Sequence, residues 1–239
     1  MLMMKRGYIP IQERLDLNKT QSASTPEEVK CMQNVPYASA VGSIMYAISC
    51  TRHDVAFAQN IASLFQHNPG KPRWTAVKTI LKYLRDTKDM FLVYGRNPEA
   101  ELRVDCYCNA GFETDRDDIK SLTRYLNNIT ASEAAMEVVW IRKFILGLGI
   151  VPTINDPIKM FCDNSAALLI ANELGVQRGA RHYHRRCHYV RECIELGEID
   201  LLKVHTYNNL ADPFTKALLK GMLTQHARSM GLRLACSFM

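Results

Sequence analysis

Residues 158–172 read IKMFCDNSAALLIAN, and this stretch decides how the second half of the chain folds. Ile, Met and Cys occupy alternate positions among its first five residues, and Asp163 stands where the alternation stops. This pattern predicts a strand that ends in a carboxylate. Asn164 or Ser165 can cap the alanine-rich helix that follows, because their side-chain oxygens accept from free backbone N–H groups. Asp163 therefore either faces a cleft at a strand end, as in many α/β folds, or helps to cap the helix.

The composition is that of an ordinary packed protein with a mild basic excess. The chain has 239 residues, of which 47% are hydrophobic, so it has room for one large domain or two modest ones. Its 30 Lys and Arg against 24 Asp and Glu give a formal net charge of +6. This excess favours acidic partners such as nucleic acid, although many enzymes carry as much.

The cysteines and the apolar runs indicate in which cellular compartment the protein is expected. Eight cysteines are scattered without a CxxC pair, and no apolar leader follows the first residues, MLMMKRGYIP. We therefore expect reduced thiols in a cytoplasmic or nuclear protein. The longest apolar runs are too short to cross a bilayer, so no membrane role is predicted.

The first 98 residues predict a mainly helical module. Thr25 precedes a proline and two glutamates, which is typical of a helix N-cap. Apolar residues at three- and four-residue steps predict two amphipathic helices across residues 37–66, interrupted near 51–54, and a third across 74–84. We expect their apolar faces to form a core. The alternative for the third helix is a nucleic-acid grip by its basic side chains Lys78, Lys82 and Arg85.

The pattern changes near residues 96–100, and residues 99–239 read as an α/β domain. A short strand at 91–94 ends the first module, and short runs of alternating or β-prone residues in the second predict strands at 102–108, 122–126, 158–162 and 199–206. Longer segments with helical spacing predict helices at 131–148, 166–171, 181–196 and 213–232.

Acidic residues at the ends of separate strands are what a divalent-metal site needs, because Mg²⁺ prefers oxygen ligands and accepts several carboxylates. Asp163 is one candidate. Asp212, between the strand at 199–206 and the last helical region, is a second. The strand at 102–108 should supply a third ligand from the same place, but the residue there is Asn109, an amide.

Several motifs follow one another along the chain. They are PYASAVGSIMYA at 36–47, TRHDVA at 51–56, NPG at 68–70, WTAVKTILKYL at 74–84, the strand at Tyr107, FCDNSA at 161–166, the histidine-rich region at 182–188 and ADPFTK at 211–216. In these motifs the chain resembles the C-terminal part of the Pol polyprotein of plant Ty1/copia-class retrotransposons. That part is the end of the reverse transcriptase followed by a ribonuclease H domain.

The resemblance implies a domain order. Residues 1–98 correspond to a C-terminal, thumb- or connection-like helical module of the reverse transcriptase, and residues 99–239 to a ribonuclease-H-like α/β domain with a mixed sheet and flanking helices. In the family a third strand separates the second strand from the first long helix, whereas here residue 130 runs directly into the helix. We therefore expect an internal deletion near 130/131 that removes one strand. The polymerase aspartate motif lies upstream in the family, so no polymerase active site is expected here.

The resemblance also implies a chemistry. Family ribonuclease H domains cut the RNA strand of an RNA/DNA hybrid with two Mg²⁺ ions held by four acidic residues. Asp163 and Asp212 match the third and fourth acids, Asn109 replaces the first, and the second, a glutamate, has no counterpart. Glu133 and Glu137 lie too far along the helix to replace it, because Mg²⁺ geometry is strict.

The loss of two acids has an electrostatic consequence. Two carboxylates in place of four leave a Mg²⁺ pair with about two units of uncompensated positive charge. We therefore predict weak or absent two-metal occupancy and impaired cleavage. The alternative is a non-catalytic remnant that binds an RNA/DNA hybrid or other nucleic acid, in the family within the rest of the Pol polyprotein.

The basic segment RGARHYHRRCHYVR, residues 178–191, allows several interpretations. The family histidine that matches His182 lies near the catalytic cleft. Phosphate contacts are available from three arginines, Arg181, Arg185 and Arg186. A solvated basic face is the plain alternative. A zinc site would need His182, His184, Cys187 and His188, but ligands so close on one helix cannot surround a tetrahedral ion.

Overall fold

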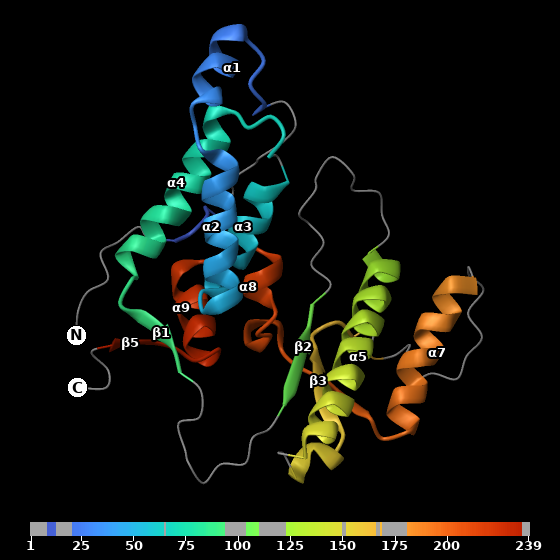
Figure 1. Ribbon diagram of the computed structural model, residues 1–239. Coiled ribbons are helices and arrows are strands. Elements are labelled where there is room, and N and C mark those ends of the chain that lie inside the picture. The colour runs from blue at the N-terminus through green and yellow to red at the C-terminus, as the bar shows by residue number, and fades with distance from the viewer. Residues whose placement is uncertain are drawn as a thin grey trace. The chain divides into compact units, whose positions relative to one another are not determined.

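The computed structural model describes residues 9–12, 21–64, 66–93, 104–109, 123–149, 152–165, 168 and 181–235 (Figure 1). The chain divides into two compact units. Among the described residues, those up to 93 and those from 213 onward form the first unit, and those from 104 to 212 form the second. None of the described helices is long and apolar enough to span a membrane.

The first unit is mainly helical, as its sequence predicts. Its described elements are α1 (Pro26–Gln33), α2 (Tyr37–Cys50), the 3-10 turn η2 (His53–Val55), α3 (Ala56–Ser63), α4 (Lys71–Asp86), β1 (Met90–Leu92), α9 (Lys220–Ser229) and β5 (Leu232–Leu234). The short helix α8 (Asp212–Thr215) lies where the chain passes from the second unit to the first.

The predicted cap of α1 is confirmed. The Thr25 hydroxyl accepts from the Glu28 backbone N–H at 3.2 Å, and the Glu28 carboxylate accepts from the Thr25 backbone N–H at 3.3 Å. These reciprocal hydrogen bonds form a capping box, which satisfies backbone donors that have no partner within the helix. The pKa of Glu28 is lowered, chiefly by the N–H of Ser24 and then by that of Thr25.

The helices predicted between residues 37 and 84 are also confirmed. The predicted interruption near 51–54 contains η2, which separates α2 from α3. The apolar spacing gives each of α2, α3 and α4 one apolar face, and these faces pack against one another. The side chains buried between the helices include Val41, Ile44, Ile61, Val77 and Ile80. The interpretation of these stripes as core is therefore correct.

The C-terminal segment belongs to the core of the first unit. Strands β1 and β5 pair antiparallel, with Met90 opposite Leu234, and the apolar core that contains Val41 also contains Leu218 and Leu223. A side chain at Gly231 would strain the backbone, since its φ is +98° and a Cβ would lie 2.9 Å from the Val93 carbonyl oxygen. Within the domain expected at residues 99–239, the described residues from 213 onward pack with the first unit.

In its described residues, the second unit contains a three-stranded parallel sheet with helices packed against it. Its described elements are β2 (Asp105–Cys108), α5 (Thr123–Leu148), the 3-10 turn η4 (Pro152–Asn155), β3 (Ile158–Cys162), α7 (Arg181–Glu195), β4 (Ile199–Lys203) and the 3-10 turn η5 (Thr206–Asn208). The strand order is β2-β3-β4, and α5 and α7 pack against each other and against the sheet (Figure 1). Buried Val139, Met160, Val190 and Ile199 form part of the core between these layers.

The strand predicted at 122–126 is wrong. Residues 123–126 form the first turn of α5, and the expected deletion point at 130/131 lies inside this continuous helix. The alanine-rich segment from 131 onward favours helix, and a helix that has begun extends at low cost into neighbouring residues.

The other predicted elements differ mainly at their ends. Strands β2, β3 and β4 and helix α7 occur where predicted, but β4 ends at Lys203, opposite the last residue of β3, and η5 begins at Thr206. The helical region predicted at 213–232 is divided into α8 and α9, and Leu232 begins β5. The helix predicted at 166–171 lies outside the described residues except for residue 168, which is helical.

Candidate functional site

The register of the parallel sheet brings two predicted site residues to the same edge. Cys108 of β2 is the partner of Cys162 of β3, so Asn109 and Asp163 are the next residues along neighbouring strands. The carboxyl ends of parallel strands meet at one edge of a sheet, which is where polar residues of α/β folds act. Asp163 is half-buried at this edge.

Asp212 joins this edge through a side-chain contact. The Asn109 side-chain amide donates from Nδ2 to Asp212 Oδ1, and Asp212 is fully buried. The Asp212 backbone N–H donates to the Asn209 carbonyl oxygen at 3.1 Å. The structure therefore brings Asn109, Asp163 and Asp212 to the same end of the sheet, from three separate segments of the chain.

Asn209 is a structural residue of this edge that the sequence analysis missed. It is fully buried, and its Nδ2 donates to the Cys108 carbonyl oxygen at 3.0 Å. Its Oδ1 accepts from the Ala211 backbone N–H at 3.1 Å. An Asn two residues before a backbone donor is the signature of an Asx turn, and this signal could have identified it. Asn209 ties the segment that carries Asp212 to the end of β2.

The donors and acceptors at this edge do not fit two Mg²⁺ ions. The Asp212 oxygen faces an N–H donor, whereas a Mg²⁺ ligand must direct a lone pair at the ion. Among the residues that the structure describes, no group of three or more His, Cys, Asp or Glu side chains could hold a metal ion. The Asn109 amide donates to one of the two Asp212 carboxylate oxygens.

Glu133 is not directed at this edge as a replacement acid. Its Oε1 lies 2.7 Å from Arg186 Nη1, so Glu133 forms an ion pair that links α5 to α7. The same ion pair engages Arg186, one of the three arginines expected to contact phosphate. Arg185 is exposed on α7. His188 Nδ1 lies 4.0 Å from Glu192 Oε2 on the same helix.

The remaining residues of the basic segment are only partly described. The backbone of α7 includes Arg181, His182, His184 and Cys187, but their side chains lie outside the described part of the chain. The structure therefore places these residues on one helix. Their roles in phosphate or metal binding stay predictions.

Two buried thiols lie directly behind the site edge. Cys108 and Cys162 are each 4% exposed, and the Cys108 thiol donates a hydrogen bond to the Cys162 sulfur. This bond raises the pKa of Cys108 and lowers the pKa of Cys162. Burial alone raises the pKa of Cys106 to about 11, so that thiol stays protonated at neutral pH.

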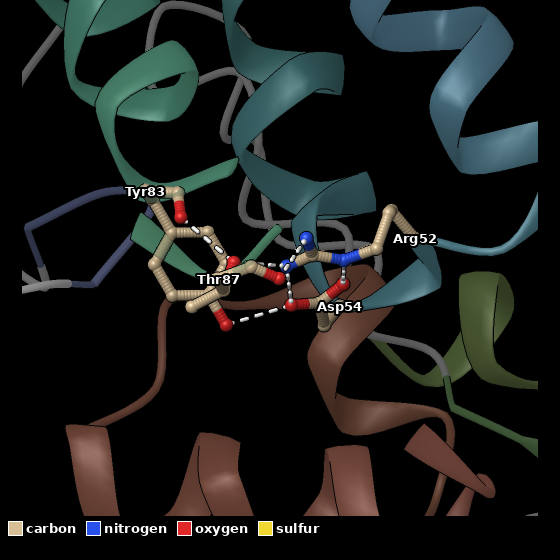
Figure 2. Close-up of polar contacts among 4 residues, drawn as sticks. All are labelled: Arg52, Asp54, Tyr83 and Thr87. Atoms are coloured by element: carbon tan, nitrogen blue, oxygen red, sulfur yellow. Dashed lines mark hydrogen bonds and ion pairs between the residues drawn. The ribbon is translucent and has the colours of Figure 1, made fainter. Parts of the chain in front are cut away.

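The TRHDVA motif forms a buried polar cluster in the first unit (Figure 2). Arg52 donates to both carboxylate oxygens of Asp54, at 2.9 and 2.8 Å, and Tyr83 donates its hydroxyl to Asp54 Oδ2 at 2.7 Å. Arg52 also donates to the Thr87 hydroxyl at 2.8 Å, and the Thr87 hydroxyl donates to the Tyr83 carbonyl oxygen at 2.7 Å. The cluster therefore joins η2 to the end of α4.

The protonation states and burial of these side chains indicate a structural role for the cluster. Burial, and then the negative charge of Asp54, raise the pKa of Tyr83, so the phenol stays protonated. Burial acts to lower the pKa of Arg52, but the hydrogen bonds and charge of Asp54 outweigh it and the pKa is raised. The cavity beside Asp54, also lined by Phe57 and Leu223, measures about 10 Å³, which is too small for a substrate.

Comparison with known proteins gives matches to curated sequences. No family model matches the chain, and no solved structure matches it. The chain is 32% identical over 234 residues to a retrovirus-related Pol polyprotein from transposon TNT 1-94 of Nicotiana tabacum, which covers 87% of this chain and 17% of that protein. It is 27% identical over 224 residues to one from transposon RE2 of Arabidopsis thaliana, which covers 82% of this chain and 15% of that protein.

A shorter stretch of the chain matches a protein that is not named as a Pol polyprotein. The secreted RxLR effector protein 161 of Plasmopara viticola is 39% identical over 95 residues, which is 40% of this chain and 66% of that protein. The long matches cover most of this chain and only about a sixth of each Pol polyprotein. Over most of its length, the chain is therefore homologous to a segment of the Pol polyproteins of Ty1/copia-class retrotransposons.

Proposed function

We propose that the second unit derives from a ribonuclease H domain that cut the RNA strand of RNA/DNA hybrids, and that this chain no longer cuts it. The observation that carries the proposal is the hydrogen bond from Asn109 to the buried carboxylate of Asp212. Two carboxylates in these places would repel each other unless a cation lay between them. An amide and a carboxylate instead form a stable pair without a metal.

The same proposal assigns the parts of the chain. Residues 1–98 are the C-terminal, thumb- or connection-like module of a reverse transcriptase, and residues 99–239 are the ribonuclease-H-like domain with a deletion near 130/131. Asp163 and Asp212 are the remaining acids of the site, and Asn109 replaces a third. The homology to Pol polyproteins and the parallel sheet with acids at one edge support this assignment.

A hybrid-cleavage assay tests the proposal. Purified wild-type protein and the Asp163→Ala variant are incubated with an end-labelled RNA/DNA hybrid and with Mg²⁺ or Mn²⁺. We expect no metal-dependent products from either protein. Metal-dependent cleavage by the wild type that disappears in Asp163→Ala would overturn the proposal, and comparison of the two preparations identifies a contaminating nuclease.

The second candidate function is nucleic-acid binding without cleavage. The observations that favour it are the net charge of +6 and the exposed Arg185 on α7. Phosphate contacts release counterions, so hybrid affinity should fall as salt rises and should fall further in Arg185→Ala. The matched control is Arg228→Ala, which removes an exposed arginine from α9 in the first unit. Salt-independent affinity, or equal losses in both variants, would contradict binding through α7.

A further inference from the structure

Cys108 and Cys162 occupy partner positions in neighbouring strands. They are opposite each other in the parallel register of β2 and β3, and both side chains lie in the core formed by the sheet, α5 and α7. Each is 4% exposed, and the two thiols are in hydrogen-bond contact. The fold therefore holds two sulfurs side by side, at the same end of the sheet as Asn109 and Asp163.

The spacing of the strands allows one group to bond to both sulfurs. Neighbouring strands lie about 4.8 Å apart, which is within the Cα–Cα range of about 4.4–6.8 Å that a disulfide spans. Both cysteines are free thiols. An atom bonded to both sulfurs can span the same gap or a somewhat longer one, because two bonds replace one. The pair can therefore take up a thiophilic bridging atom.

We propose that Cys108 and Cys162 form a dithiol site for trivalent arsenicals. An arsenoxide, R–As=O, reacts with the two thiols to form two As–S bonds. Its oxygen leaves as water with the two thiol protons, and arsenic stays in the +3 state, so no oxidant is needed. This site does not depend on the proposed ribonuclease H ancestry, because it needs only the register of β2 and β3.

Other described cysteines offer no equivalent pair. Cys31 and Cys50 are exposed free thiols on α1 and α2. Cys193 lies in the same core as the pair, but its thiol is hydrogen-bonded to Tyr189 and Glu198. Cys106 lies two residues before Cys108, and its register partner is Met160. Cys106 and Cys193 are therefore matched controls for the proposed pair.

The test uses phenylarsine oxide and the full-length protein. After labelling, excess monothiol removes arsenic held by one sulfur, and intact mass spectrometry counts what remains. We expect one retained phenylarsenic group per chain, which 2,3-dimercaptopropanol then removes. The Cys108→Ala and Cys162→Ala variants should lose the retained group, and Cys106→Ala and Cys193→Ala should keep it.

Peptide mapping of the labelled wild type keeps the proposal falsifiable if a variant fails to fold. We expect a single arsenic-bridged species that joins the peptide containing Cys108 to the peptide containing Cys162. A bridge between any other two cysteines would overturn the proposal, as would the absence of a retained group in folded wild-type protein. Retention of the group in folded Cys108→Ala or Cys162→Ala would also overturn it.

Discussion

The side-chain amide of Asn109 donates a hydrogen bond to Asp212, an aspartate with no exposed surface. A buried carboxylate needs a donor or a cation, because losing its hydration without compensation is costly. Here the donor comes from the end of β2. The hydrogen bond links the end of β2 to Asp212 and gives this buried carboxylate a donor.

We expect Asn109→Asp to destabilise the protein without restoring activity. The substitution removes the donor and places two carboxylates in contact, so it should cost about 1–3 kcal/mol for the lost donor, and more for the repulsion. Urea unfolding measures the loss, and the hybrid-cleavage assay measures activity. Asn109→Ala, which removes the donor without adding charge, separates the two contributions. Measurable cleavage by Asn109→Asp alone would contradict our account of the missing glutamate.

Removal of the Asp54 charge should destabilise the first unit strongly. Asp54 is 2% exposed and accepts from Arg52 and Tyr83, so Asp54→Asn leaves a buried guanidinium without its counter-ion. Breaking a buried ion pair in this way costs about 3–5 kcal/mol. The matched control is Asp86→Asn at the Arg85–Asp86 pair, where the arginine is largely exposed and the expected change is below about 1 kcal/mol. Equal losses of unfolding free energy in both variants would contradict a structural role for the cluster.

The packing of the C-terminal segment makes Leu223 a core residue of the first unit. Leu223→Ala should cost about 2–5 kcal/mol, because a buried side chain is lost and a cavity remains. Leu219→Ala, which truncates a largely exposed leucine next to α9, should change the stability by less than about 0.5 kcal/mol. Trp74 packs against the same core, so its fluorescence in a Trp140→Phe background reports unfolding of this unit. An unchanged midpoint in Leu223→Ala would show that the segment is not part of that core.

Helix α5 carries an exposed apolar stripe that should promote self-association. Met136, Trp140, Phe144 and Leu148 recur every four residues and are all exposed, and the rings of Trp140 and Phe144 stack at 5.5 Å. The double variant Trp140→Gln/Phe144→Gln should remain monodisperse at higher concentration in light scattering, with little change in stability. Val139→Gln on the buried face should instead unfold the second unit. Equal aggregation of the wild type and the double variant would contradict this expectation.

Local signals predicted most elements of both units. The Thr25 cap, the interruption between α2 and α3, and the strand before Asp163 all depend on neighbouring residues, which a sequence shows directly. The strand at 122–126 was wrong because a short run of mixed residues takes the structure of the helix that continues from it. Short segments therefore follow their neighbours, and their intrinsic preferences alone do not decide them.

Features that depend on distant parts of the chain were harder to predict. Leu223 has the spacing of a core residue, but spacing does not show which of two cores it enters. Asp163 and Asn109 could be placed together because parallel strands end at one edge, whereas the contact between Asn109 and Asp212 depends on how residues 204–211 are folded. Asn209 holds that segment to β2, and its role becomes visible only once both are positioned.

Manganese binding to the wild-type protein tests the central claim most directly. Mn²⁺ can replace Mg²⁺ in carboxylate sites, and its paramagnetism allows free and bound ions to be counted in solution. We predict no saturable binding at the Asp163–Asp212 edge, and titration curves that are the same for the wild type and for Asp163→Ala. Saturable binding of two ions per chain that is lost in Asp163→Ala would contradict the claim that the hydrogen bond from Asn109 to Asp212 has taken the place of metal coordination.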